Sequence, residues 1–177
     1  MKVHELLQES DNDSELTAFL TKWYRDHEMV KPETIDELIK KYPEFKFSDD
    51  VRRAVTITKE DAKALRHDDG ETHSWRSALD HKKVEDFISK HEPNRYVSGS
   101  QNSKGFYNFL ENGNGLGQED FVVDCEYTNV EGLSLHKMAA SIKNKTHELQ
   151  RIIDVTEVIF KSKGAKFWIQ EIMEPKE

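Results

Sequence analysis

Apolar residues in this chain never form an uninterrupted run longer than three. A helix that crosses a membrane needs about 20 consecutive, mainly apolar residues, so this pattern excludes a transmembrane helix. The first ten residues also lack the apolar stretch of a signal peptide, and we therefore expect a cytosolic location. Nine Phe, five Tyr and three Trp among 177 residues supply enough bulk for one core, so we expect a single domain over residues 1–177.

The N-terminal part has the residue spacing of amphipathic helices. Ser14 can cap a helix over residues 14–28, in which apolar side chains recur every three or four positions. A second helix follows Pro32, a residue suited to the first turn, and ends before Pro43. We therefore expect residues 1–50 to form a helical cover. The remaining residues, 51–177, are expected to form the core of the domain.

The rest of the chain alternates between helices and strands and ends on strands. Thr58 and Asp80 can cap two short helices that run to Leu65 and to about residue 90. A helix is also expected after residue 100, presenting Phe106 and Phe109, and another over residues 136–149. Strands are expected over 51–57, 96–100, 121–127, 152–160 and 165–172, the last two joined by a turn at 161–164. Helices gather first and strands last, which indicates an α+β fold.

The charge balance argues against one class of partner. The chain has 26 Lys or Arg against 34 Asp or Glu, a formal net charge of −8. Such a balance disfavours salt-driven, nonspecific binding to nucleic acid. Between Lys137 and Lys166, however, basic residues outnumber acidic ones, so one local face can be basic.

One strand contains an arginine among aliphatic residues. Alternation along residues 51–57 places Arg53 on the same face as Val51, Val55 and Ile57. Burying a guanidinium group costs free energy unless a partner compensates its charge. The pattern therefore predicts an anion beside Arg53, although strand arginines commonly extend their charge to solvent at a sheet edge instead.

Two other segments carry polar groups within strand-like sequence. The segment Tyr96-Val97-Ser98-Gly99-Ser100 has two hydroxyl groups, and Glu157 lies in the aliphatic strand that ends at Phe160. Taken singly, a Ser-Gly-Ser segment is typical of a turn and a strand glutamate is typical of a solvent-facing position.

In this order and spacing, Arg53, the segment 96–100 and Glu157 resemble the mono-ADP-ribosyltransferases of the arginine–serine–glutamate class, which includes clostridial binary-toxin subunits and bacteriophage enzymes. The resemblance extends from about Tyr42 to Ile172. Its most specific part is the run Glu157-Val158-Ile159-Phe160 followed by Gly164-Ala165-Lys166-Phe167. The resemblance implies an α+β fold in which N-terminal helices pack on a mixed, mainly antiparallel two-sheet core with an NAD cleft.

The resemblance also implies what these residues do. Arg53 would hold the phosphates of NAD, and Ser98 would orient both Arg53 and Glu157 by hydrogen bonds. Glu157 would bind the nicotinamide ribose and stabilise the cation that forms there, and Phe109, eleven residues after Ser98, would stack on nicotinamide. Ala54 and Ser100 complete the expected NAD-binding residues, and no metal is implied.

The implied reaction transfers ADP-ribose from NAD to a macromolecule, with protein expected ahead of nucleic acid as the acceptor. A monomeric enzyme of phage type, acting on a host target in the host cytoplasm, fits this resemblance. The main alternative is a catalytically inactive acidic protein of the same fold that binds and blocks a host protein.

The motifs leave several assignments open. Arg52 competes with Arg53, and Ser77 competes with Ser98. The central threonine of the family's serine strand is Gly99 here. Val155 stands where arginine-modifying members have Glu or Gln, so a protein side chain, a nucleic-acid base and water all remain open as acceptors.

Three other patterns have simpler interpretations. Cys125, in an apolar run, is expected to be a small buried side chain rather than a reactive thiol. The glycines between 113 and 117 predict a plain turn, because a phosphate-binding glycine loop needs a strand before it and a helix after it. A metal hydrolase could use a polar cluster as ligands, but a solvated loop is favoured for it; the cluster is His67, Asp68, Asp69 and His73.

Overall fold

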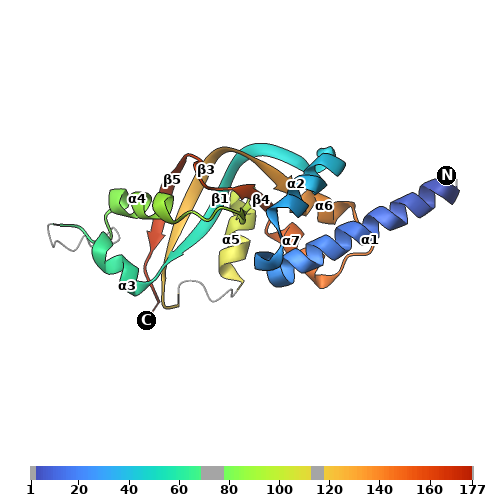
Figure 1. Cartoon of the computed structure of the whole chain (residues 1–177). Coiled ribbons are helices and arrows are strands. Elements are labelled where there is room, and N and C mark those ends of the chain that lie inside the picture. The colour runs from blue at the N-terminus through green and yellow to red at the C-terminus, as the bar shows by residue number, and fades with distance from the viewer. Residues whose placement is uncertain (1–2, 69–77, 113–117, 177) are drawn as a thin grey trace.

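The computed structural model of the chain describes residues 3–68, 78–112 and 118–176. It has an α+β architecture, as the sequence indicates (Figure 1). The helices are α1 (Val3–Asp26), α2 (Pro32–Lys41), α3 (Lys59–Ala62), α4 (His81–His91), α5 (Ser103–Glu111), α6 (Leu135–Ser141) and α7 (His147–Asp154). The strands are β1 (Lys46–Ile57), β2 (Tyr96–Ser100), β3 (Phe121–Ser134), β4 (Glu157–Lys161) and β5 (Phe167–Met173).

Several helix ends are where the capping residues predict them. The Thr58 hydroxyl accepts a hydrogen bond from the backbone N–H of Asp61, and the Asp80 carboxylate accepts one from the N–H of Lys83. These bonds satisfy amide donors that lack a partner in the first turn of a helix. Pro32 is the first residue of α2, where its missing N–H costs nothing.

Other helix predictions were wrong at their ends. Helix α1 begins at Val3, so Ser14 lies inside it rather than at its cap. The helix expected over 136–149 is two helices, because Thr146 caps α7 by accepting from the N–H of Leu149. Helix α7 then continues to Asp154, which replaces the first residues of the strand expected over 152–160. The β-branched pair at 152–153 favours a strand locally, but Ile152 is buried against α1 and α6 as part of an amphipathic helix.

The strands also differ from the prediction. Strand β1 begins at Lys46, five residues earlier than expected, because its first residues pair with 130–133 of β3. Strand β3 is longer too, continuing through a residue with positive φ, Asn129, to Ser134. The last two strands are joined by a turn containing Gly164, at a φ of 81°, but they are not neighbours: β3 lies between β4 and β5.

Every strand pair of the described residues is antiparallel, in the order β1-β2-β4-β3-β5. The expectations of a mixed sheet and of a two-sheet core are therefore corrected: the described strands form one five-stranded sheet. Strand β3 pairs through its first half with β1 and β5, and through its last residues with β4 and the start of β1. Strands β1 and β2 pair only at Arg52 and Ser100, and they separate beyond that point.

The helices lie in two groups on the sheet (Figure 1). One group, α1, α2, α6 and α7, encloses a core with Leu20 and Leu135 at its centre. The other, α3 and α4, covers a second core that includes Cys125, which is fully buried as predicted. Helix α5 lies between the two groups of helices, next to the point where β1 and β2 separate. No helix in the described part of the chain has both the length and the apolar character needed to cross a membrane.

Candidate functional site

Three neighbouring strands bring together the three residues that the sequence singles out. The backbone carbonyl of Ser98 on β2 accepts a hydrogen bond from Nη1 of Arg53 on β1, at 2.6 Å. The hydroxyl of the same serine donates to Oε1 of Glu157 on β4, also at 2.6 Å. Ser98 therefore contacts both an arginine and a glutamate from the strands on either side of it.

Arg53 occupies the space that opens between β1 and β2. Because these strands pair only at Arg52 and Ser100, the carbonyl of Ser98 has no β1 amide opposite it and accepts from the Arg53 guanidinium instead. The Nε of Arg53 is buried without a hydrogen-bond partner. Glu92 lies close enough for its charge to favour the protonated form of Arg53, but no carboxylate within the described ranges forms an ion pair with this guanidinium. Burial lowers the pKa of Arg53, although a guanidinium stays protonated in proteins.

Glu157 is the first residue of β4 and is held by two donors. Its Oε1 accepts from Ser98 and, at 3.4 Å, from the indole Nε1 of Trp23 on α1. Burial raises the pKa of Glu157 above its ordinary value, and both hydrogen bonds act in the opposite direction. The residue before it, Thr156, has a φ of 47°, a left-handed conformation that costs free energy in a β-branched residue. The backbone thus turns sharply at Thr156, immediately before the residue that carries the carboxylate, Glu157.

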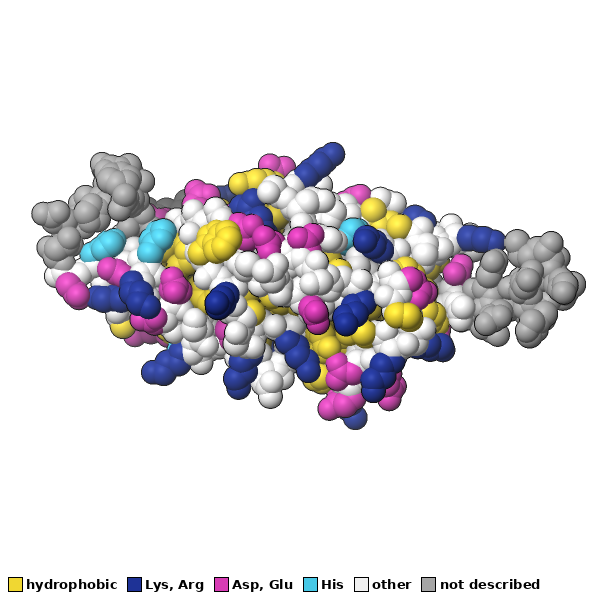
Figure 2. Space-filling view, turned by 90° about the horizontal axis from the view of Figure 1, so that it is seen from above, with side chains coloured by type: hydrophobic (Ala, Val, Ile, Leu, Met, Phe, Trp, Pro, Cys, Tyr) yellow, Lys and Arg dark blue, Asp and Glu magenta, His cyan; other side chains and the backbone are white. Residues whose placement is uncertain are grey.

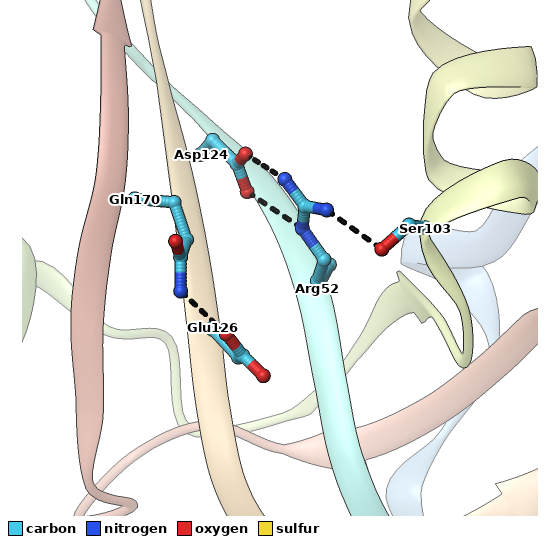
Figure 3. A network of polar contacts seen from close by, with 5 residues as sticks. All are labelled: Arg52, Ser103, Asp124, Glu126 and Gln170. Atoms are coloured by element: carbon cyan, nitrogen blue, oxygen red, sulfur yellow. Dashed lines mark hydrogen bonds and ion pairs between the residues drawn. The ribbon is translucent and has the colours of Figure 1, made fainter.

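Arg52 is engaged differently from Arg53. It forms a two-point ion pair with Asp124 on β3, and its Nη1 donates to the Ser103 hydroxyl on α5 at 2.9 Å (Figure 3). Its guanidinium also lies over the rings of Phe106 and Tyr107, 4.7 and 5.2 Å from their centroids. All three of its nitrogens are used, chiefly by Asp124, which raises its pKa. Arg52 therefore anchors α5 to the sheet, and Arg53 retains free donor capacity.

A cavity of about 470 Å³ opens above these strands. This volume is within the range of about 300–1,000 Å³ that small-molecule sites occupy. The sequence-predicted residues that line it are Arg53, Ala54, Ser98, Ser100, Phe109 and Glu157, with Arg52 beside them. All the expected NAD-binding residues therefore meet at one cavity. Ser77, the rival of Ser98, lies outside the described residues.

The charged side chains that line the cavity are mainly basic, whereas the chain as a whole has a net charge of −8. Four arginines line it, Arg52, Arg53, Arg95 and Arg151. Glu157 is the only carboxylate among its described lining residues. Of the four, only Arg52 forms an ion pair with a described residue. An anionic ligand fits such a cavity, because free guanidinium groups bind phosphate and carboxylate through charge-assisted hydrogen bonds.

Two departures from the family motif, Gly99 and Val155, have structural explanations. A Cβ atom on Gly99 would lie 2.3 Å from Cγ1 of Val51 and 2.9 Å from the carbonyl oxygen of Arg52. The close approach of β1 therefore leaves no room for a threonine. Val155 is not on the glutamate strand at all: it caps the C-terminus of α7, is 8% exposed and contributes an apolar side chain to the cavity wall.

Sequence reasoning missed the contribution of the N-terminal helix and of α7. Trp23, Tyr24 and His27 line the cavity from α1 and the turn after it, and Arg151 lines it from α7. The spacing of Trp23 is that of a core residue, and it is indeed buried at 3% exposure. No local signal distinguishes a core tryptophan from one whose N–H reaches a carboxylate 134 positions away.

The other sequence candidates do not form a site in the described residues. No group of three or more metal-ligating side chains occurs among residues 3–68, 78–112 and 118–176. His67 faces Asp80 at 3.5 Å, and Asp68 pairs with Lys83 at 2.5 Å. Asp69, His73 and the glycine segment 113–117 lie outside the described residues.

Comparisons of the chain with protein-family models, with curated proteins and with solved structures found no match. What this site can do therefore follows from its own geometry and chemistry.

Proposed function

We propose that this chain is an NAD-dependent mono-ADP-ribosyltransferase with an ADP-ribosyltransferase-like core, which releases nicotinamide and transfers ADP-ribose to a macromolecular acceptor. The observation that carries the proposal is the continuous contact from Arg53 through Ser98 to Glu157, across three adjacent strands at the floor of one cavity. The family resemblance assigns Ser98 hydrogen bonds to these two residues; here its hydroxyl binds Glu157, and its backbone carbonyl, rather than its hydroxyl, binds Arg53.

The free donors of the cavity support NAD as the ligand. NAD carries a pyrophosphate, which needs fixed cationic donors, and the Arg53 guanidinium has one buried nitrogen without a partner. Its planar fork suits two phosphate oxygens at once. The apolar part of the wall, from Phe106, Phe109, Ile152 and Val155, suits the nicotinamide ring, which stacks well on aromatic side chains.

Glu157 supplies the electrostatic element of the reaction. The bond between the ribose C1′ and the nicotinamide nitrogen breaks, and its electron pair neutralises the ring nitrogen. The ribose then carries positive charge, as in glycoside cleavage. A fixed carboxylate beside C1′ stabilises that charge, and preorganised electrostatics of this kind is usually the largest catalytic contribution. Ser98 and Trp23 both bind Oε1, which leaves Oε2 free for a ribose hydroxyl.

The decisive experiment measures nicotinamide release from NAD by the purified protein, alone and with cell lysate, beside the Glu157→Gln variant. Glutamine keeps the size and the hydrogen-bond acceptor but removes the charge. We expect turnover to fall by about 10²-fold or more, with NAD binding retained. Equal turnover in the variant and the parent would refute the role of Glu157.

Binding is tested separately by calorimetry and by thermal unfolding. NAD that binds only the folded state raises the melting temperature. Arg53→Lys should weaken NAD binding about 10-fold or more, because lysine cannot form the two-point contact. Lack of nicotinamide release together with lack of a thermal shift would favour the alternative, an inactive protein that acts by binding a partner.

A further inference from the structure

Arginine side chains line two walls of the cavity. On the strand wall, Arg53 and Arg95 are close enough for the charge of Arg95 to contribute to the lowered pKa of Arg53. On the helical wall, His27 follows α1 and Arg151 belongs to α7. The strand wall supplies the donors that the proposed function gives to the pyrophosphate of NAD, so the helical wall is left for another group.

The helical wall stands at the Glu157 end of the cavity. His27 lies 5.6 Å, between ring centroids, from Trp23, and the Trp23 indole reaches the Glu157 carboxylate. Arg151 lies one helical turn before Val155. Val155 in turn is two residues before Glu157 in the sequence. The Arg25–Glu148 ion pair, at 2.7 Å, joins α1 to α7 and engages the acidic side chain in the first turn of α7. Arg151 itself forms no ion pair with any residue that the structure describes.

These positions constrain what attacks the ribose carbon. An arginine or lysine acceptor is cationic, would meet Arg151, and must lose a proton before its nitrogen can bond to C1′. Glu157 is the only described carboxylate at the cavity, and its Oε1 is already bound by two donors. A carboxylate acceptor is attracted by Arg151, is already ionised at neutral pH and needs no base.

We propose that the acceptor is the carboxylate of an aspartate or glutamate in a protein, and that the product is an ADP-ribosyl ester; this rests on the proposed function. The electron pair of a carboxylate oxygen forms the new bond to C1′ as the bond to nicotinamide breaks. The electron pair of the broken bond goes to the nicotinamide nitrogen. The anion and the cationic nicotinamide nitrogen are both neutralised, so no proton is released and no further reactant is needed.

A protein acceptor is favoured over a nucleic acid by the charge of the whole molecule. Binding a phosphate backbone depends on several lysines and arginines that displace its counterions. This chain has a net charge of −8, and Figure 2 shows basic and acidic side chains interspersed over the face in view rather than gathered into a basic area. A single carboxylate needs only the cations inside the cavity, which act over the roughly 8–10 Å that salt leaves unscreened.

The test uses NAD labelled in its adenylate phosphate and peptides that differ in one residue type: repeats of Glu-Ala-Ala, Gln-Ala-Ala and Arg-Ala-Ala, with a single-stranded oligonucleotide beside them. We expect label on the glutamate peptide, about 10-fold or more above the glutamine and arginine peptides. Neutral hydroxylamine should release that label, because it cleaves acyl esters. Label on the arginine peptide or the oligonucleotide, or nicotinamide release that labels none of the four probes, would overturn the carboxylate assignment.

Two charge-reversal variants test whether Arg151 is responsible for transfer to the glutamate peptide. Arg151→Glu should lower transfer to the glutamate peptide by about 10-fold and should lower nicotinamide release without peptide by less. Lys90→Glu makes the same charge change on α4, outside the cavity, and should transfer like the parent. Equal loss in both variants would contradict a specific role for Arg151. Nicotinamide release that depends on Glu157 shows that the proposed function holds, so failure of this inference is distinguishable from failure of that function.

Discussion

At the scale of single residues, the site depends on which donors remain uncommitted. Arg52 and Arg53 are adjacent and chemically identical. Asp124 and Ser103 bind the guanidinium of Arg52, which also lies over two aromatic rings, whereas among the described residues Arg53 donates a hydrogen bond only to a backbone carbonyl. An arginine with all its nitrogens engaged holds structure together, and one with free nitrogens can bind a ligand. Of the two competing arginines, Arg53 is therefore the one with donors left for a ligand.

The same scale gives Trp23 a role that its burial alone would not suggest. Its N–H stabilises the charged form of Glu157, against the burial that raises the pKa of this carboxyl. Trp23→Phe removes that donor and keeps an aromatic ring, so the pKa should rise further. The active carboxylate is then lost at higher pH, and the acid limb of the pH–rate profile for nicotinamide release should move upward. Turnover on that limb should fall about 5-fold, as expected for one hydrogen bond.

The control for this variant is Tyr24→Phe, which changes the neighbouring residue of the same helix. Tyr24 lines the cavity but makes no hydrogen bond to Glu157. Its acid limb should coincide with that of the parent. A Trp23→Phe limb that also coincides with the parent would show that Trp23 only fills space.

At the scale of elements, the site depends on how closely three of them approach one another. Helix α5 packs on the residues that precede β4: a Cβ on Gly105 would lie 2.1 Å from the Thr156 Oγ1 and 2.6 Å from the Val155 carbonyl oxygen. The left-handed Thr156 therefore lies under the first turn of the helix that carries Phe109. Glu157 and Phe109 are positioned by the same contact, since α5 carries Phe109 and packs on the residues just before Glu157.

Gly105→Ala tests this contact with a clear sign. In an exposed helix, replacing glycine by alanine stabilises by about 1 kcal/mol. Here the added methyl group meets backbone, so we expect the free energy of unfolding to fall by about 1–3 kcal/mol in urea titration. Weaker NAD binding should accompany the loss. The adjacent exposed change Lys104→Ala should leave both quantities close to those of the parent, and a stabilised Gly105→Ala protein would contradict the proposed packing.

At the scale of the whole molecule, the N-terminal helices belong to the structure that forms the site. Leu16, Phe19, Leu20 and Trp23 of α1 share one buried cluster with Leu149 and Ile152 of α7. The same helices supply the tryptophan and the arginine on the helical wall of the cavity. Loosening α1 should therefore affect both stability and the site.

Leu20→Ala tests that coupling. Leu20 is fully buried, and removing its side chain leaves a cavity that should cost about 2–5 kcal/mol of unfolding free energy. Fluorescence and circular dichroism should report one shared transition in urea, displaced to lower concentration. Met29→Ala, at a position 66% exposed, should change stability by less than about 0.5 kcal/mol. Separate transitions for the N-terminal helices and the sheet would show that the cover unfolds by itself.

Local patterns account for much of the fold. Side-chain caps at Thr58 and Asp80, the proline start of α2 and the strand-like sequence of β2 act within a few residues, so the corresponding elements were predicted correctly. The predictions failed where distant segments decide. The start of β1 forms because β3 pairs with it, and residues 152–154 are helical because Ile152 is buried against α1. Neither partner is visible in the local sequence.

The sequence by itself determined the α+β class, most of the elements and the residue types that resemble a transferase motif, because capping, periodicity and motif spacing are local properties. Only the tertiary structure decided that Arg53, Ser98 and Glu157 touch, that Arg52 is already paired, and that Trp23 and Arg151 join them at one cavity. The physical reason is that hydrogen bonds and ion pairs depend on distances of a few ångströms between groups far apart in the chain. Such distances are set when strands separate and helices pack, and no short segment specifies them.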